Sequence, residues 1–278
     1  MALLKVLLLL LGLGESDTLD TLPLAANAMN YVDRCVAVSS VSLQKRIIGG
    51  QNCRDDERHY HVKVFAFNKT KEKLCGGSLI SDQWVLTAAH CWKSDPGWAI
   101  EAQVGVHPKT ALKLIYRITQ REIYIDSNGR EHDIMLLKLP VKITAIRPIR
   151  LPDCPDTLLL GTKVQIAGFG ATQVGFFNKR VKDSPDGLQC AEFKIVKNEK
   201  LEKTMAKLEY FKRTYQKWYS VRSSKKDTSQ GDSGGGFVFN NRLYGVMAFT
   251  GDPWYAFSEP SGFTEVCAYK QWIDDTIN

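Results

Sequence analysis

Three short segments of this 278-residue chain hold the residues that could do chemistry. Ser233 lies in GDSGG (residues 231–235), where glycine neighbours leave the hydroxyl and nearby backbone N–H groups open to a substrate. His90 ends the run LTAAH, and Asp133 begins the apolar run DIMLL, where a carboxylate is costly to bury without a partner. A histidine can take the proton of a serine hydroxyl, and a carboxylate can hold the histidine in the correct tautomer. The segments predict a nucleophile, a base and an orienting group.

In the order His, Asp, Ser, these motifs resemble the trypsin and chymotrypsin family of serine proteases. The resemblance runs from Ile47 to the C-terminus. It implies an all-β fold of two antiparallel six-stranded barrels, at about residues 47–145 and 155–267, followed by a C-terminal helix. It also implies hydrolysis of peptide bonds in protein or peptide substrates through an acyl-enzyme, without a cofactor.

The family resemblance assigns further site residues. The N–H groups of Gly231 and Ser233 are expected to form the oxyanion hole. Asp227, six residues before the serine, matches the base of the specificity pocket and implies cleavage after Arg or Lys. Thr250 and Ser261 match wall positions that are usually glycine and would narrow the pocket, although a shift of the match by one residue puts Gly262 at the wall in place of Ser261. The alternative is a granzyme- or elastase-like protease that cuts after small residues.

The N-terminal part predicts export and activation. A lysine followed by a short apolar run indicates a signal peptide at residues 1–15, too short to span a membrane, although the small-residue pattern at residues 26–28 leaves the cleavage site open. Residues 16–46 are expected to form an activation propeptide. We expect a secreted zymogen, located outside the cell or in secretory granules.

Activation is expected at the bond between Arg46 and Ile47, cut by a protease that prefers basic residues. The resemblance implies that the new amino group of Ile47 pairs with Asp232, because a buried carboxylate is unfavourable without a partner. Cleavage would then order the oxyanion hole.

Seven cysteines occur, and six of them follow residue 46, which allows 15 pairings from the sequence alone. The resemblance selects three disulfides, and Cys35 is left without an obvious partner. The selected pairs are Cys75 with Cys91, Cys53 with Cys190, and Cys154 with Cys267. A metal site is the competing interpretation, but the sequence has no C-x-x-C spacing and only five histidines, so no metal is expected.

Composition fits many short strands, because 44% of the residues are hydrophobic and lie in short runs punctuated by Gly and Pro. Helical spacing of apolar residues indicates helices at residues 198–210 and 269–277. The net charge is +7, and residues 194–226 combine many basic side chains with aromatic ones. A solvated surface is the simplest explanation, and a sulfated glycosaminoglycan is the candidate partner. Nucleic acid is not expected to bind a secreted protease.

Asn68 begins the only Asn-x-Ser/Thr triplet, in a polar turn, and is the expected glycosylation site. Two departures from the family pattern stand out. Ala248 replaces a serine that usually supports the triad aspartate, and Ser229 replaces a cysteine near the pocket. A protease-like protein that binds without cutting is the other class considered, but such homologues usually lose a catalytic residue or the motif glycines, and none is lost here.

Overall fold

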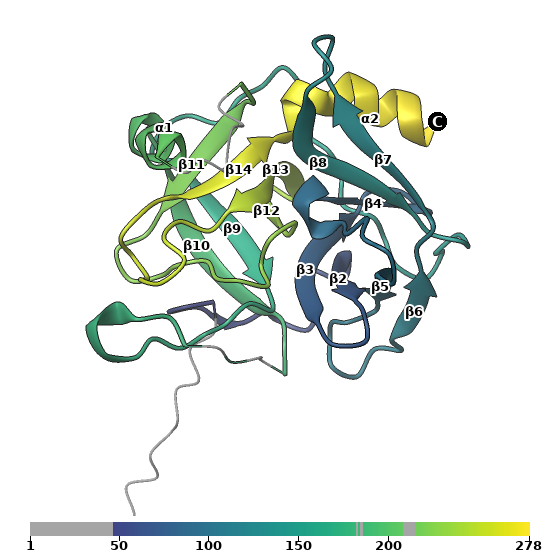
Figure 1. Ribbon diagram of the computed structural model, residues 1–278, viewed down its shortest axis with the longest axis horizontal. Coiled ribbons are helices and arrows are strands. Elements are labelled where there is room, and N and C mark those ends of the chain that lie inside the picture. The colour runs from purple at the N-terminus through teal and green to yellow at the C-terminus, as the bar shows by residue number, and fades with distance from the viewer. Residues whose placement is uncertain (1–46, 182, 184–185, 208–214) are drawn as a thin grey trace, which may run out of the picture. The chain divides into compact units, whose positions relative to one another are not determined.

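A computed structural model describes residues 47–181, 183, 186–207 and 215–278. Two antiparallel β-sheets, each of seven strands, make up this part of the chain (Figure 1). The expected all-β fold is confirmed.

The first sheet is a curled sheet with the strand order β6-β5-β2-β3-β4-β8-β7. Its inner face follows from sequence alternation: Val62, Val64 and Ala66 of β2 are buried, whereas the residues between them are partly exposed. Among the described strands no pairing joins β6 to β7, so this half is not the closed six-stranded barrel that the resemblance implied. The strands are β2 (His61–Phe67), β3 (Glu72–Leu79), β4 (Trp84–Thr87), β5 (Ala99–Val104), β6 (Leu114–Arg117), β7 (Gln120–Ile125) and β8 (Glu131–Lys138).

The second sheet contains the predicted closed barrel, because β9 pairs with both β10 and β12. Its core includes Phe193, Phe237 and Phe263, with Phe237 and Phe263 in an edge-to-face contact. The strands are β9 (Lys163–Gly168), β10 (Gln189–Val196), β11 (Trp218–Arg222), β12 (Gly236–Phe239), β13 (Arg242–Phe249) and β14 (Ser261–Glu265).

Strand β1 (Gln51–Asn52) corrects the expected division of the chain. It falls in the range predicted for the first barrel but pairs with β10 of the second sheet, with Gln51 opposite Cys190. The reason is a long-range contact, because the disulfide between Cys53 and Cys190 holds this segment against β10.

Both predicted helices are present, and the last part of the first predicted range, residues 208–210, lies outside the described residues. α1 (Glu199–Ala206) buries Leu201 and Met205, and α2 (Lys270–Ile277) buries Ile273. Within the described ranges, no helix has the length and apolar character needed to cross a bilayer.

All three expected disulfides are formed. Cys75 is bonded to Cys91, Cys53 to Cys190, and Cys154 to Cys267. The first bridge fixes β3 to the short 3-10 helix η1 (Ala89–Cys91), and the third anchors the chain just before α2. Cys35 lies outside the described residues.

Candidate active site

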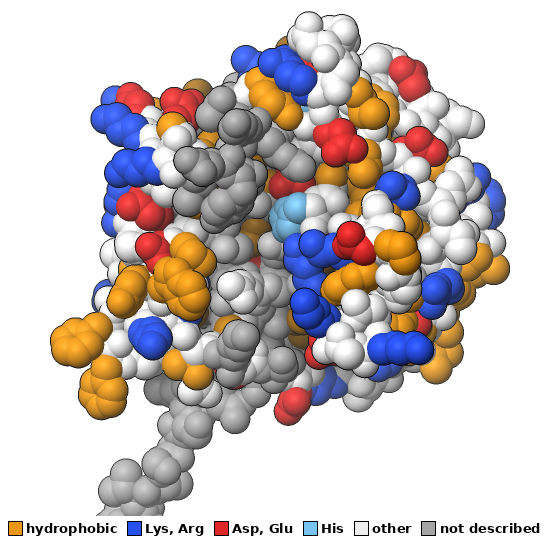
Figure 2. Space-filling model, viewed as in Figure 1, with side chains coloured by type: hydrophobic (Ala, Val, Ile, Leu, Met, Phe, Trp, Pro, Cys, Tyr) orange, Lys and Arg blue, Asp and Glu red, His pale blue; other side chains and the backbone are white. Residues whose placement is uncertain are grey.

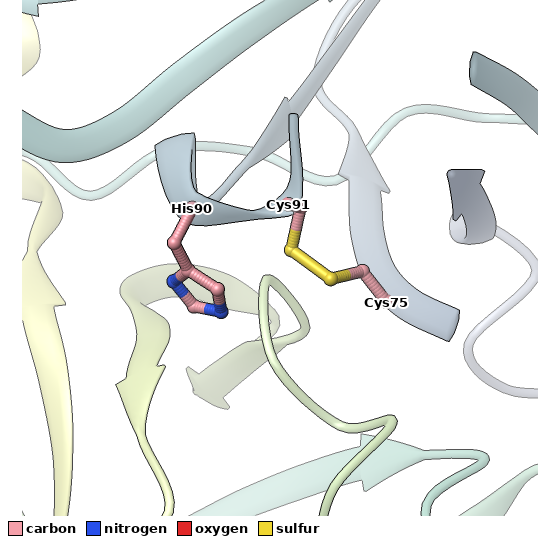
Figure 3. A group of neighbouring side chains, drawn as sticks. All are labelled: Cys75, His90 and Cys91. Carbon is pink, nitrogen blue, oxygen red and sulfur yellow. A yellow bond between two sulfur atoms is a disulfide. The ribbon is translucent and has the colours of Figure 1, made fainter. Parts of the chain in front are cut away.

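His90 and Asp133 are placed by neighbouring strands of the first sheet. His90 lies on η1, directly after β4, and Asp133 lies on β8, which pairs with β4. His90 and Cys91 extend from the same short helix, and Cys91 is tied to Cys75 (Figure 3). The disulfide therefore limits the freedom of the segment that carries the imidazole.

The two side chains form a tight pair. The ring Nδ1 of His90 lies 2.8 Å from Asp133 Oδ2, and the backbone N–H of His90 donates to Asp133 Oδ1 at 2.9 Å. The Asp133 side chain is fully buried, whereas that of His90 is 27% exposed. A buried carboxylate held at two points fixes the imidazole with Nδ1–H toward Asp133, leaving Nε2 to accept a proton.

Gln216 supports Asp133, a role that sequence reasoning missed. The N–H of Asp133 donates to Gln216 Oε1 at 2.7 Å, and the Asp133 carbonyl oxygen accepts from the Thr264 hydroxyl at 3.4 Å. Ala248, at the position where the family usually has a serine, packs in an apolar cluster with Leu201. No sequence signal points to Gln216, which lies 83 residues from Asp133.

The turn that carries Ser233 is held where the two sheets meet. The carbonyl oxygen of Ser233 accepts the N–H of Gly76 on β3 at 2.7 Å, and Gly234 donates its N–H to Met247 on β13. Gly234 has a φ of +80°, and a Cβ there would lie 2.2 Å from the Thr87 hydroxyl oxygen. Glycine is therefore required at this position by both conformation and space.

Gly231 has a φ of +101°, the left-handed region that favours glycine. Within the described part of the chain, the N–H groups of Gly231 and Ser233 donate no hydrogen bond. Both donors are therefore available for the oxyanion role expected of them.

Asp232 is a fully buried carboxylate behind this turn. It accepts the N–H of Gly170 at 2.7 Å and that of Ser229 at 2.9 Å. Burial raises the pKa of Asp232 to about 7, although the two N–H groups lower it. No cation among the described residues forms an ion pair with it. Ile47, whose amino group is the expected partner, is itself fully buried, and Arg46 lies outside the described residues.

The expected pocket residues lie near one another. Ile48 pairs with Asp227, and Thr228 next to it bonds the Ser261 hydroxyl at 2.6 Å. Burial raises the pKa of Asp227 above its usual range, whereas the positive charge of Arg180 lowers it. Arg180 was not predicted: its guanidinium Nη2 donates to Asp227 Oδ2 at 2.6 Å and to the Thr250 carbonyl oxygen at 3.2 Å.

His132, the residue before Asp133 on β8, is buried. It is 7% exposed and lies between Tyr124, Tyr215 and Tyr269. Its Nδ1 is 2.7 Å from the Tyr269 hydroxyl. Aromatic side chains from distant segments cover it, which the sequence around His132 does not reveal.

Among the residues that the structure describes, two groups of side chains have a spacing that could hold a metal ion. One consists of Cys75, His90 and Cys91, and the other of Cys53, Glu57 and Cys190. In both groups the two sulfur atoms are joined in a disulfide, so neither offers the thiolates that a zinc site uses (Figure 3).

Comparison with known proteins agrees with these features. A sequence model of the family described as Trypsin matches residues 47–273. Human serine protease 1 is 32% identical over 242 residues, covering 84% of this chain and 90% of that protein. Kallikrein-8 of Rattus norvegicus is 31% identical, covering 84% and 86%. A solved structure of neuropsin, a serine protease of mouse brain, has a TM-score of 0.66 and 28% identity, and covers 83% of this chain and all of that one.

Proposed function

The chain belongs to the trypsin family of serine endopeptidases, and on that premise we propose that Ser233, His90 and Asp133 are its catalytic residues. The observation that carries the assignment is the buried pair in which Asp133 holds His90 at both the ring and the backbone. The substrates are proteins or peptides.

In the proposed reaction, the Ser233 hydroxyl attacks the peptide carbonyl while His90 Nε2 takes its proton. His90 then gives that proton to the leaving amine, and an acyl-enzyme remains. Water, activated by the same histidine, releases the acyl group. The N–H groups of Gly231 and Ser233 stabilise the oxyanion, where one donor contributes about 3 kcal/mol to transition-state binding.

For the substrate residue on the acyl side of the cut, we propose two alternative specificities. The buried carboxylate of Asp227 supports cleavage after Arg or Lys. The second preference, for small residues, is favoured by one observation: Arg180 of the same chain already pairs with Asp227, and its Nη2 bonds the wall carbonyl of Thr250. Ser261 adds a second wall side chain larger than glycine.

We further propose that the protein is secreted as a zymogen, with residues 1–15 as signal peptide and residues 16–46 as propeptide. An activating protease cuts after Arg46, and the freed amino group of Ile47 pairs with Asp232. The buried position of Ile47 and the raised pKa of Asp232 support this pairing.

A positional substrate library, presented to the chain cleaved after Arg46, tests the proposed function. Hydrolysis that is blocked by a fluorophosphonate supports a serine endopeptidase, and the most rapidly cleaved sequences give the acyl-side preference. An absence of hydrolysis across the library, together with an absence of fluorophosphonate labelling, would favour a homologue that only binds.

An N-linked glycan is expected at Asn68. The residue lies in the turn between β2 and β3, where its side-chain oxygen accepts the N–H groups of Thr70 and Lys71 at 2.9 and 2.8 Å. The oxygen holds the turn, and the amide nitrogen is the atom that takes the sugar. A peptide N-glycosidase should lower the mass of protein from animal cells. Thr70→Ala, which removes the sequon, should abolish that shift; a glycosidase shift that persists in this variant would contradict the site.

A sulfated glycosaminoglycan is the proposed partner of the basic segment at residues 194–226, because clustered positive charge attracts polyanions. Lys212 and Arg213 lie outside the described residues, and Lys200 of the described part is paired with Glu259 at 3.4 Å. Reversing the charge of Lys212, Arg213 and Lys217 should lower the salt concentration at which the enzyme leaves heparin.

The matched control reverses Lys69, Lys71 and Lys109, three exposed lysines outside this segment. It changes the net charge equally. An equal loss of heparin retention in both triple variants would show that net charge alone governs binding.

A further inference from the structure

We propose that Arg180 is a specificity-determining residue of this protease: it occupies the base of the primary pocket, where a basic substrate side chain would pair with Asp227, and thereby disfavours cleavage after Arg and Lys. The proposal rests on the proposed function, because it assigns the acyl-side preference of that site. Its basis is a set of contacts that a substrate arginine would otherwise make.

Arg180 makes the contacts of a bound ligand. The three nitrogens of its guanidinium donate four hydrogen bonds, to the Asp227 carboxylate and to the carbonyl oxygens of Thr228, Thr250 and Asp252. The side chains of Arg180 and Asp227 are only 8% and 6% exposed. A planar, charged group with this many partners resists displacement by another cation.

Both oxygens of the Asp227 carboxylate already accept hydrogen bonds within the protein. Its Oδ1 accepts the N–H of Thr228 at 2.9 Å, and its Oδ2 accepts the N–H of Phe257 at 2.8 Å in addition to Arg180. A substrate arginine would therefore have to displace the Arg180 guanidinium from Asp227, and the displaced guanidinium would have to be solvated by water. A small substrate side chain does not need to reach Asp227.

The backbone also holds Arg180 in place. Residues 173–181 form a small hairpin, in which Gly175 donates its N–H to the Lys179 carbonyl oxygen at 2.7 Å. The return arm pairs with a second loop: the N–H of Arg180 donates to the Trp254 oxygen, and the N–H of Ala256 donates to the Asn178 oxygen, both at 2.9 Å. Arg180 is thus a fixed part of the pocket floor rather than a swinging surface side chain.

The tip of this hairpin turns the opposite way. Phe176 and Phe177 are 92% and 93% exposed, and Figure 2 shows hydrophobic side chains protruding at the lower left, where Figure 1 has the loop that follows β9. Since the apolar tip residues stay in solvent while the charged residue is buried, the contacts of Arg180 with Asp227 and the carbonyl oxygens hold the inner part of the hairpin.

The test compares the Arg46-cleaved wild type with Arg180→Gln on matched substrates that differ only in Arg, Lys, Ala or Val at the acyl side. We expect the ratio of kcat/KM for Arg over Ala to rise on the order of 100-fold in Arg180→Gln. Benzamidine is an amidinium that needs a free carboxylate, so its Kd should be on the order of 10-fold lower, or lower still, for the variant than for the wild type. Lys179→Gln, which removes an exposed charge from the same hairpin, is the matched control and should change neither value.

Placing Arg180→Gln in an Asp227→Asn background should abolish both gains, because the carboxylate is then gone. An unchanged Arg-to-Ala ratio and unchanged benzamidine binding in folded Arg180→Gln would overturn the proposal. A second outcome would also overturn it: the double variant Thr250→Gly with Ser261→Gly gains cleavage after Arg, and Arg180→Gln does not. The side chains of the pocket wall would then be the cause of the low Arg cleavage.

Thermal unfolding verifies that Arg180→Gln folds. If it does not fold, Arg180→Lys replaces it, a variant that keeps a cation on a shorter side chain. We expect its ratio of kcat/KM for Arg over Ala to rise about 10-fold, and an unchanged ratio would overturn the proposal. Fluorophosphonate labelling of Ser233 separates the two failures. Labelling without any effect of Arg180 contradicts this inference alone, whereas absent labelling contradicts the proposed function, and benzamidine binding still tests the pocket.

Discussion

Replacing Asp133 with asparagine is expected to lower the turnover of the activated enzyme about 10⁴-fold. The carboxylate accepts two N–H groups of His90, at 2.8 and 2.9 Å, and an asparagine amide would place a donor against one of them. The imidazole would then favour the tautomer that cannot take the proton of Ser233. The measurement is kcat on a peptide substrate, with fluorophosphonate labelling of Ser233 as a second readout.

Asp153→Asn is the matched control for this substitution, because Asp153 is exposed and pairs with Arg242 at the surface. It should leave kcat unchanged. Ser233→Ala and His90→Ala should both abolish labelling. The catalytic assignment fails if Asp133→Asn keeps more than about a tenth of the activity, or if Ser233→Ala is still labelled.

Replacing Asp232 with asparagine in the cleaved enzyme is expected to lower kcat/KM on the order of 10²- to 10³-fold. Asp232 accepts N–H groups of Gly170 and Ser229 and lies between the two proposed oxyanion donors in sequence. Without the proposed ion pair to the Ile47 amino group, the turn would lose its anchor. Asp153→Asn again serves as control, and a kcat/KM within about twofold of wild type would contradict the activation scheme.

The pH dependence of stability gives an independent test of the same pair. In the uncleaved chain, burial raises the pKa of Asp232 to about 7 from an ordinary 3.8, so the native state keeps a proton that the unfolded chain releases. The free energy of unfolding should therefore fall by roughly 2 to 4 kcal/mol as the pH rises from about 4 to about 7.

Asp232→Asn should remove this fall in the uncleaved chain, and cleavage after Arg46 should also remove it, because the new cation stabilises the charged carboxylate. Denaturant unfolding at several pH values measures both effects. Identical pH profiles for the uncleaved and cleaved forms would show that Asp232 gains no charged partner on cleavage.

Local motifs predicted much of the molecule. The family resemblance supplied the disulfides, and helical spacing predicted α1 and α2, while GDSGG and LTAAHC remain the basis on which Ser233 and His90 are proposed. These features are encoded within short stretches or within a shared family pattern. The second barrel followed from the same resemblance.

The features that were missed depend on contacts between distant segments. β1 joins the second sheet through a disulfide whose two cysteines lie 137 residues apart in sequence, and the first sheet stays open between β6 and β7. Arg180 lies 47 residues from Asp227 on an irregular hairpin, so neither periodicity nor a motif indicates that its side chain is buried. Its placement is decided only when two loops pair.

Because those two loops pair through the hairpin that carries Arg180, binding of a ligand in the pocket and stability of the hairpin are expected to affect each other. A molecule that binds Asp227 by displacing Arg180 must also weaken the hairpin, and by thermodynamic linkage a molecule that holds the hairpin down must weaken that binding by the same factor. Phe176 and Phe177 at the exposed tip belong to the same hairpin as the buried Arg180, so on this proposal a molecule that holds the tip would also affect the displacement of Arg180. In such a protease, an antibody or inhibitor that grips the aromatic tip would change substrate preference without touching Ser233.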